Sequence, residues 1–347
     1  MKTKKTDEHT STGREVFYYQ VYGLTLRTNQ PLSDLSPLSD VTDVDAISIH
    51  LARTWEESAM PVPSSAWQPS LKHSRLQTAT LEEGTYLLLS FIEDEQAYAE
   101  FVINPSGENI WITVGEGADQ RFVTWLLLGI VLGCVLRIRG ITCLHANVVT
   151  VGQKAIAILG AKGAGKSTIT AALLQRGAKL LADDVAVLVE QNNTFFVQPG
   201  YPGLRLHEDV ATQLYGSYKH LQSATPKPDL WPTKRYLSLV ERQELFSQTL
   251  FPLTAIYILG DRSSDRQSVS IETLSSVTGL LDLMQNTYVS WMLSKTDMKN
   301  EFRVLSCLAR TVPLRKIHRP NNLAKLPQLC EAILADANSY LLNLSLI

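Results

Sequence analysis

The chain has 347 residues, of which 45% are hydrophobic and 19% are charged, and its formal net charge is −2. This length favours two domains over one, because single domains usually contain about 100–200 residues. The slightly negative charge disfavours nucleic acid as a partner, since binding to a phosphate backbone needs clustered Lys and Arg in excess. The composition is that of an ordinary globular protein and indicates neither disorder nor a fibrous repeat.

The sequence offers little evidence for a secretory signal or a membrane span. Residues 1–14 are polar and of mixed charge, so we expect a disordered tail and not a secretory signal, which needs an apolar core. The longest apolar run, 122–136, lies between two arginines and is shorter than the roughly 20 residues that span a bilayer. We predict a buried helix over 121–137 and no membrane span. Four scattered cysteines without a C-x-x-C pair indicate reduced thiols and a cytoplasmic location.

Residues 15–118 predict a β-rich N-terminal domain. Short apolar or alternating runs are typical of strands, and turn-forming segments such as 104–109 separate them. The runs read FYYQVYGLTL, AISIHLA, TYLLLSF, AYAEFVI and NIWITV.

Residues 119–347 predict an α/β domain. After the helix at 121–137, strands are expected at 143–151 and 155–159, followed by a glycine-rich turn, a helix at about 166–176 and a strand at 179–182. This order describes a βαβ unit, whose parallel strands leave ligands at their carboxyl ends. The later expectations are strands at 254–259 and 302–309, helices at 277–294 and 326–341, and a surface loop at 213–234.

The segment GAKGAGKS at 160–167 matches G-x-x-x-x-G-K-[ST] at every fixed position. Glycines let the backbone wrap a polyphosphate, Lys166 supplies a positive charge, and the Ser167 hydroxyl is a ligand for Mg²⁺. A chance match is expected on the order of 1% of the time in a chain of this length, and here a strand precedes the loop and a helix follows it. We predict binding of ATP or another nucleoside triphosphate with Mg²⁺, through Gly160, Ala161, Lys162, Gly163, Ala164, Gly165, Lys166, Ser167 and Thr168.

Two adjacent carboxylates, Asp183 and Asp184, end an apolar strand 17 and 18 residues after Lys166. One could hold Mg²⁺ while its neighbour accepts a proton from the acceptor as general base. A simple Mg²⁺ site or a helix cap are the alternatives. His145 precedes the P-loop strand and could approach the phosphates, although a lone His on a strand is usually structural.

Three segments around these residues resemble a known family. LHANVV, GAKGAGKST and RGAKLLADDVAVL look like the catalytic core of HPr kinase/phosphorylase, a bacterial serine kinase with its own type of P-loop. The flanking VYGLTLRTNQPLSDL, QPGYPGLRLHEDV and VPLRKIHRPNNLAKLP are more similar to HPr-kinase-related proteins found beside peptide-modification genes, including lasso-peptide precursor kinases. The resemblance implies an α/β P-loop kinase domain behind the β-rich N-terminal domain, in which Lys166 contacts phosphate and Ser167 the metal. It also implies Asp184 as the base, with Asp183 beside it at the metal, and His145 in the active site.

The sequence departs from that family at one motif. HPr kinases carry a Glu-Ile-Arg-Gly-type signature, whereas this chain has Arg205 in GLRL with no Glu before it. The departure disfavours both HPr as substrate and phosphorylase activity. Arg205 is a candidate for phosphate or substrate contact, or for a surface salt bridge. A basic cluster at 315–319 fits a solvated face, or contact with nucleotide or an acidic peptide.

These observations lead to one prediction and two alternatives. The prediction is an ATP-dependent serine kinase that acts on a peptide or small protein, such as a lasso-peptide precursor. The alternatives are a kinase for a small-molecule alcohol and a nucleotide-dependent regulator without catalysis. The resemblance also suggests a homo-oligomer.

Overall fold

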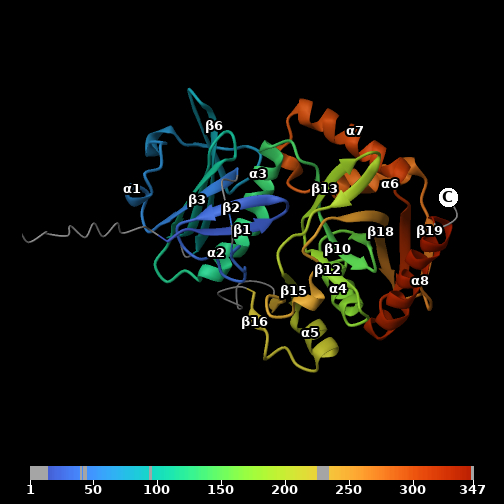
Figure 1. The fold of residues 1–347 in the computed structure, drawn as a ribbon. Coiled ribbons are helices and arrows are strands. Elements are labelled where there is room, and N and C mark those ends of the chain that lie inside the picture. Colours follow the sequence, from blue (N-terminus) through green and yellow to red (C-terminus); the bar gives the residue numbers. More distant parts are fainter. Residues whose placement is uncertain (1–14, 40, 42–44, 94–95, 225–233, 345–347) are drawn as a thin grey trace, which may run out of the picture.

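The computed structural model describes residues 15–39, 41, 45–93, 96–224 and 234–344. The predicted disordered tail at 1–14 lies outside these residues. Figure 1 shows two sheets with a long helix between them, and further helices around the second sheet. The chain thus combines mixed sheets with helices, as the sequence predicted.

The N-terminal part forms an eight-stranded sheet with strand order β1-β2-β3-β8-β7-β6-β5-β4. Strands β2, β3 and β8 are parallel to one another, and the other neighbours are antiparallel. The apolar runs read from the sequence are all strands, and FYYQVYGLTL makes two. The bounds are β1 Phe17–Val21, β2 Leu24–Thr28, β3 Ala46–Ala52, β4 Gln68–Pro69, β5 Leu76–Leu81, β6 Gly84–Glu93, β7 Gln96–Ile103 and β8 Asn109–Val114.

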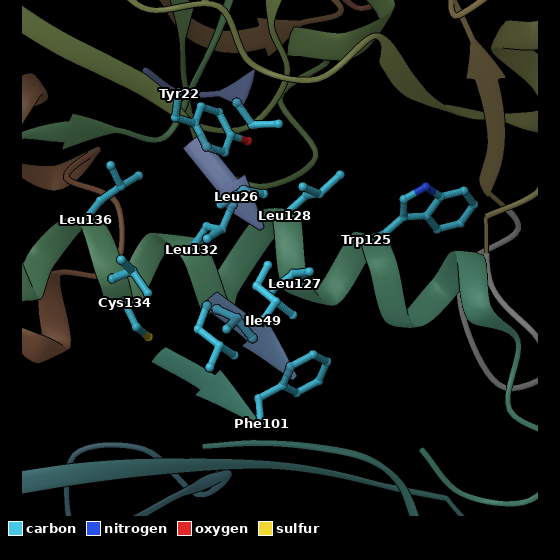
Figure 2. Packing of buried hydrophobic residues seen from close by; sticks show 14 of the residues in the cluster. Tyr22, Leu26, Ile49, Phe101, Trp125, Leu127, Leu128, Leu132, Cys134 and Leu136 are labelled. Atoms are coloured by element: carbon cyan, nitrogen blue, oxygen red, sulfur yellow. The ribbon is translucent and has the colours of Figure 1, made fainter. Parts of the chain in front are cut away.

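The predicted buried helix is present and covers one face of this sheet. α2 (Gln120–Leu126), a π-helical turn (Leu127–Val131) and α3 (Leu132–Ile138) form one continuous helix. It is long and apolar enough to cross a membrane, but 67% of its apolar window is buried inside the protein. Figure 2 shows its side chains packed with residues of the N-terminal strands. The domain boundary expected after residue 118 stays a prediction.

The second sheet has the order β12-β10-β11-β18-β14-β13-β9, with β20 beside β18 and β19 beside β20. The expected strand at 143–151 is interrupted at His145. Strands β11 and β12 run in the same direction but are not neighbours, because β10 lies between them and is antiparallel to both. The bounds are β9 Cys143–Leu144, β10 Ala146–Val151, β11 Lys154–Leu159, β12 Lys179–Ala182, β13 Ala186–Gln191, β14 Thr194–Val197, β18 Phe251–Ser263, β19 Ser270–Thr273 and β20 Leu314–Pro320.

Helices cover both faces of the second sheet (Figure 1). α4 (Lys166–Leu174) and α8 (Leu326–Leu344) contribute to the core on one face, and α6 (Ser276–Gln285) and α7 (Lys295–Thr311) to the core on the other. The strand predicted at 302–309 is wrong, because these residues belong to α7. A capping box at Ser294 starts this helix, and its buried residues recur at helical spacing. The helix predicted at 277–294 corresponds to α6, which ends earlier, at Gln285.

A small third sheet adjoins the candidate site. It contains β15 (Gly203–His207), β17 (Lys234–Ser238) and β16 (Gln222–Ser223), and α5 (Glu208–Tyr215) follows β15. The loop predicted at 213–234 therefore begins within a helix and contains a short strand, and its residues 225–233 lie outside the described part. The remaining short helices are α1 Trp55–Ser58 and the 3-10 turns Ser64–Ala66, Gln243–Leu245, Ser290–Met292 and Leu323–Lys325.

The candidate functional residues lie along one edge of the second sheet. Strands β11, β12, β18 and β20 run in the same direction, so their carboxyl ends meet at this edge. The first residue of β10 pairs with the last of β11, which brings the preceding His145 to the same edge. Ligands of open α/β sheets bind at such an edge.

Candidate functional site

The P-loop connects the carboxyl end of β11 to the first turn of α4. Three glycines in it have positive φ: +156° at Gly160, +80° at Gly163 and +97° at Gly165, which is the N-cap of α4. A Cβ atom on Gly165 would lie 2.8 Å from a guanidinium nitrogen of Arg262. Lys166 is buried, and its Nζ donates to the Gly160 carbonyl at 2.8 Å. The lysine side chain thus lies across the loop. The backbone of the loop has the arrangement that binds an anion at a helix N-terminus.

Two arginines hold the loop from the neighbouring strands. Arg262 of β18 donates to the carbonyls of Gly163 at 3.3 Å and Ala164 at 3.2 Å. Arg319 of β20 donates to the same Ala164 carbonyl, and only 6% of the residue is exposed. Burial and the charge of Arg262 lower the pKa of Arg319 to about 10, so it stays positively charged near neutral pH. A solvated face, one interpretation of the basic cluster, is therefore wrong for Arg319.

The other members of that cluster have different partners. Arg315 pairs with Asp336 at 2.5 Å, Lys316 with Asp282 at 3.3 Å, and His318 with Glu272 at 3.0 Å. The basic residues at 315–319 therefore do not form a single basic patch on the surface.

The adjacent carboxylates follow β12 in a tight turn. Asp184 has φ +62°, and the Val185 amide donates to the Asp183 carbonyl at 2.8 Å. Asp tolerates this left-handed conformation better than most residues, but such strain still persists only where the surroundings impose it. The two carboxylates differ in their main partner, although the Nε of Arg205 is also 4.0 Å from Asp183. Asp184 pairs with Arg205 of β15, and Asp183 accepts a hydrogen bond from Asn147 at 2.7 Å.

The two carboxylates have opposite pKa shifts. The Asp183 side chain is fully buried. Its pKa is raised, first by this burial and then by the charge of Asp184. Burial also acts to raise the pKa of Asp184, but the nearby positive charges, with Arg205 foremost, more than offset it, so that the pKa is lowered. We therefore expect Asp184 to be the ionised member of the pair and Asp183 the member that retains a proton to higher pH.

His145 lies between β9 and β10 in a defined orientation. Its backbone amide donates to the Asn286 carbonyl at 2.6 Å, and its ring stacks on Tyr288 at a centroid distance of 5.9 Å. Ring nitrogen Nδ1 is 3.1 Å from the Asp184 carbonyl. Because a carbonyl oxygen can only accept, Nδ1 carries the proton and Nε2 is the acceptor of the neutral ring. Burial lowers the pKa of His145, which favours this neutral form.

These elements enclose a cavity of about 740 Å³. Among the residues that the structure describes, seven basic side chains but only two carboxylates line it, although the whole chain has a net charge of −2. The seven are Lys162, Lys166, Arg205, Lys234, Arg262, Arg319 and Lys325, and the carboxylates are Asp184 and Asp209. Such a cavity suits a ligand with several negative charges.

The structure brings most of the predicted site residues to this cavity. Those that line it are His145, Lys162, Gly163, Gly165, Lys166, Ser167, Thr168, Asp184 and Arg205. Gly160, Ala161 and Ala164 belong to the loop without lining the cavity, and Asp183 is buried beside Asp184.

Asn147 and Arg262 were missed by the sequence prediction, and Arg319 was noted only as a member of the basic cluster at 315–319. Asn147 lies two residues after His145, so strand alternation could have placed both on one face. Arg262 and Arg319 lie near the ends of β18 and β20. Their place beside the P-loop could have been found only with the knowledge that both strands end there.

The donors at the site fit Mg²⁺ bound together with a nucleotide. The Ser167 hydroxyl and the Asp184 carboxylate both line the cavity, and Asp183 Oδ2 makes no hydrogen bond within the described part of the chain. No group of three or more His, Cys, Asp or Glu that could hold a metal occurs among the described residues. Mg²⁺ usually takes one or two carboxylates, substrate phosphates and several waters, and the donors present match that pattern.

Comparisons with known proteins find similarity among solved structures but not among family models or curated proteins. No family model and no curated protein matches the chain. Among solved structures, the chain is similar to the Hpr(Ser) kinase/phosphatase from Coxiella burnetii, with 13% sequence identity and a TM-score of 0.34. The similarity covers 58% of this chain and 92% of that one.

Proposed function

We propose that the chain is an ATP-dependent kinase that phosphorylates an alcohol group, namely a serine hydroxyl of a peptide or small protein. One observation carries the proposal. A single cavity contains a P-loop with an excess of basic side chains and, beside it, the carboxylate of Asp184 and the neutral ring of His145.

The basic part of the cavity suits the polyphosphate. Backbone amides at the start of α4, the Nζ of Lys166 and the guanidinium groups of the site would share the negative charge of the β- and γ-phosphates. Mg²⁺, held by Ser167 and a carboxylate of the Asp pair, would neutralise part of that charge. Lys166 is held by a loop carbonyl, so it needs little rearrangement to reach a phosphate oxygen.

Asp184 is the group that we assign to the acceptor. Its carboxylate is ionised and lines the cavity, whereas Asp183 is buried and holds its proton more readily. The acceptor hydroxyl would give its proton to Asp184 as its oxygen bonds to the γ-phosphorus, and the bond from that phosphorus to the β-phosphate oxygen breaks. The rate then depends on positioning and on charge stabilisation.

The peptide acceptor is the finer part of the proposal. It is supported by the resemblance of the flanking segments to HPr-kinase-related proteins found beside peptide-modification genes, including lasso-peptide precursor kinases. The four free and scattered cysteines support a cytoplasmic site of action.

The test is incubation with γ-labelled ATP, Mg²⁺ and the peptides or small proteins encoded beside the gene, followed by mass analysis of the products. We expect label on a serine, lost in Lys166→Ala and in Asp184→Asn. Lys154→Ala, at the opposite end of β11, is the matched control and should transfer label normally. Undiminished transfer in Lys166→Ala would sink the proposal.

The same experiment separates the alternatives. Label on a small alcohol and on no peptide would indicate a small-molecule kinase. Nucleotide binding that changes partner affinity, with no phosphorylated product, would indicate a regulator.

A further inference from the structure

The hairpin between β1 and β2 has a strained tip. Val21 pairs with Leu24 across a two-residue turn, in which φ is +60° at Tyr22 and +75° at Gly23. Positive φ at both positions is typical of a type I′ turn, which favours Asn, Asp or Gly at its first position. A bulky side chain in this conformation is an outlier. Such strain persists where the surroundings enforce it and is concentrated at functional sites.

The surroundings of this tip include the segment that follows β14 and the end of β12. Tyr22 is 2% exposed, and its amide donates to the Pro199 carbonyl at 2.8 Å. A Cβ atom built on Gly200 would lie 3.2 Å from the Tyr22 ring and 3.3 Å from the Cα of Ala182. The ring and Ala182 thus lie against the same glycine, where a Cβ atom would make tight contacts with both.

This contact leads directly to the candidate site. The Gly200 amide donates to the Leu181 carbonyl at 2.7 Å, which ties the segment under Tyr22 to the last residues of β12. Ala182 is followed by Asp183 and Asp184. In Figure 2 the Tyr22 side chain lies at the opposite end of the buried cluster from Phe101.

We propose that Tyr22 is a positioning residue of this site: its ring, acting through Gly200 and Ala182, fixes the turn that carries Asp183 and Asp184. The N-terminal sheet is thereby needed to complete the site. The inference rests on the proposed kinase function.

Electrostatics support the proximity. The pKa of Tyr22 is raised well above its ordinary value, first by burial and then by Tyr201 and Tyr288, with smaller contributions from both aspartates. The phenol and the carboxylates are therefore within electrostatic reach of one another. The phenol oxygen makes no hydrogen bond within the described part of the chain, so the geometry assigns the effect to the ring and not to the hydroxyl.

Two substitutions separate the ring from the hydroxyl, and a third serves as control. Tyr22→Asn relaxes the turn but removes the ring, and Tyr22→Phe keeps the ring. Tyr86→Asn removes a tyrosine ring that is 6% exposed in the same sheet but belongs to another core cluster. Because a misplacement of about 1 Å can cost about 100-fold in rate, we expect Tyr22→Asn to lower kcat by about tenfold or more. The Kd for ATP should stay within about twofold in that variant, since the P-loop lies on other elements; Tyr22→Phe and Tyr86→Asn should keep the wild-type kcat.

A second readout does not depend on phosphoryl transfer. Hydrogen exchange at the Gly200 and Val185 amides reports the hydrogen bonds that these amides donate to Leu181 and Asp183. We expect faster exchange at both amides in Tyr22→Asn and not in Tyr86→Asn. If the wild type transfers no phosphoryl group but Tyr22→Asn shows this faster exchange, the kinase function fails while the positioning role stands.

Three results would overturn the inference. The first is a wild-type kcat and unchanged exchange in Tyr22→Asn. The second is an equal loss of kcat in Tyr22→Asn and Tyr86→Asn, which would reduce the effect to general stability. The third is a loss in Tyr22→Phe as large as in Tyr22→Asn, which would assign the role to the hydroxyl.

Discussion

Replacing Arg205 by Met should destabilise the protein in a strongly pH-dependent way. The Arg205 guanidinium pairs with Asp184, and its Nε is 4.0 Å from Oδ2 of Asp183. The Arg205 side chain is 29% exposed, that of Asp184 25% and that of Asp183 not at all. Removal of the arginine therefore leaves two adjacent and largely buried carboxylates without this cation.

The size of the effect follows from these distances and exposures. Two unit charges about 4 Å apart attract by about 4 kcal/mol at an effective dielectric constant of about 20. The partial exposure of Arg205 and Asp184, the desolvation of the guanidinium and the uptake of a proton by a carboxylate all reduce this value. We expect a loss of about 2 kcal/mol in the free energy of unfolding near neutral pH.

The pKa shifts determine how the free energy of unfolding changes with pH. Arg205 lowers the pKa of Asp184, so the pair stabilises the protein above the ordinary pKa of Asp, and this stability is lost as pH falls through the folded value. In Arg205→Met the pKa of both carboxylates rises, and stability then falls as pH increases above about 4. The difference between wild type and variant should be smaller at about pH 4.5, where the carboxylates of the variant can keep a proton, than at about pH 8.

The assay is urea unfolding at both pH values. Arg235→Met is the matched control, because Arg235 lies on the adjacent β17 and pairs with Glu208 at similar exposure; its smaller loss should depend little on pH. Adding Asp183→Asn to Arg205→Met should recover about 1 kcal/mol or more, as a double-mutant cycle would measure. An equal loss at the two pH values in Arg205→Met would refute the reasoning.

Three further predictions concern other parts of the molecule. Burial lowers the pKa of His145, so phosphoryl transfer should persist at pH values below the ordinary pKa of histidine and fall only at still lower pH, and in His145→Asn the pH–rate profile should lack this acidic limb. Glu301→Gln removes the charged partner of buried Arg137 at 2.9 Å and should lower the free energy of unfolding by about 3 kcal/mol in urea, whereas an unchanged value would show that the pair contributes nothing. Gly165→Ala should weaken ATP binding about tenfold by calorimetry because of its φ of +97° and the crowding at its Cβ. Gly140→Ala, with φ +70° and open space, is its control, and equal affinities in the two variants would contradict the crowding argument.

Local patterns were enough to predict much of the chain. The loop at 160–167 needs only glycine, lysine and serine at fixed spacing, since its anion cradle is built from contiguous backbone. The continuous helix Gln120–Ile138 and the strands of the N-terminal sheet follow from apolar periodicity, which depends on near neighbours. The prediction failed at 302–309, where a short apolar stretch fits either a strand or one face of a helix, and the capping box at Ser294 decides for the helix.

The composition of the site depends on contacts between distant segments. Arg319 was only one member of a basic cluster in the sequence, and its place beside the P-loop follows from the pairing of β20 with β18 and of β18 with β11. Tyr22 reaches Asp183 and Asp184 through Gly200, from which it is separated by more than half of the chain. The sequence by itself determined the phosphate-binding loop, because its residues are adjacent. Only the tertiary structure decided which arginines, which carboxylate and which tyrosine surround it, because strand order sets those contacts and no local spacing records it.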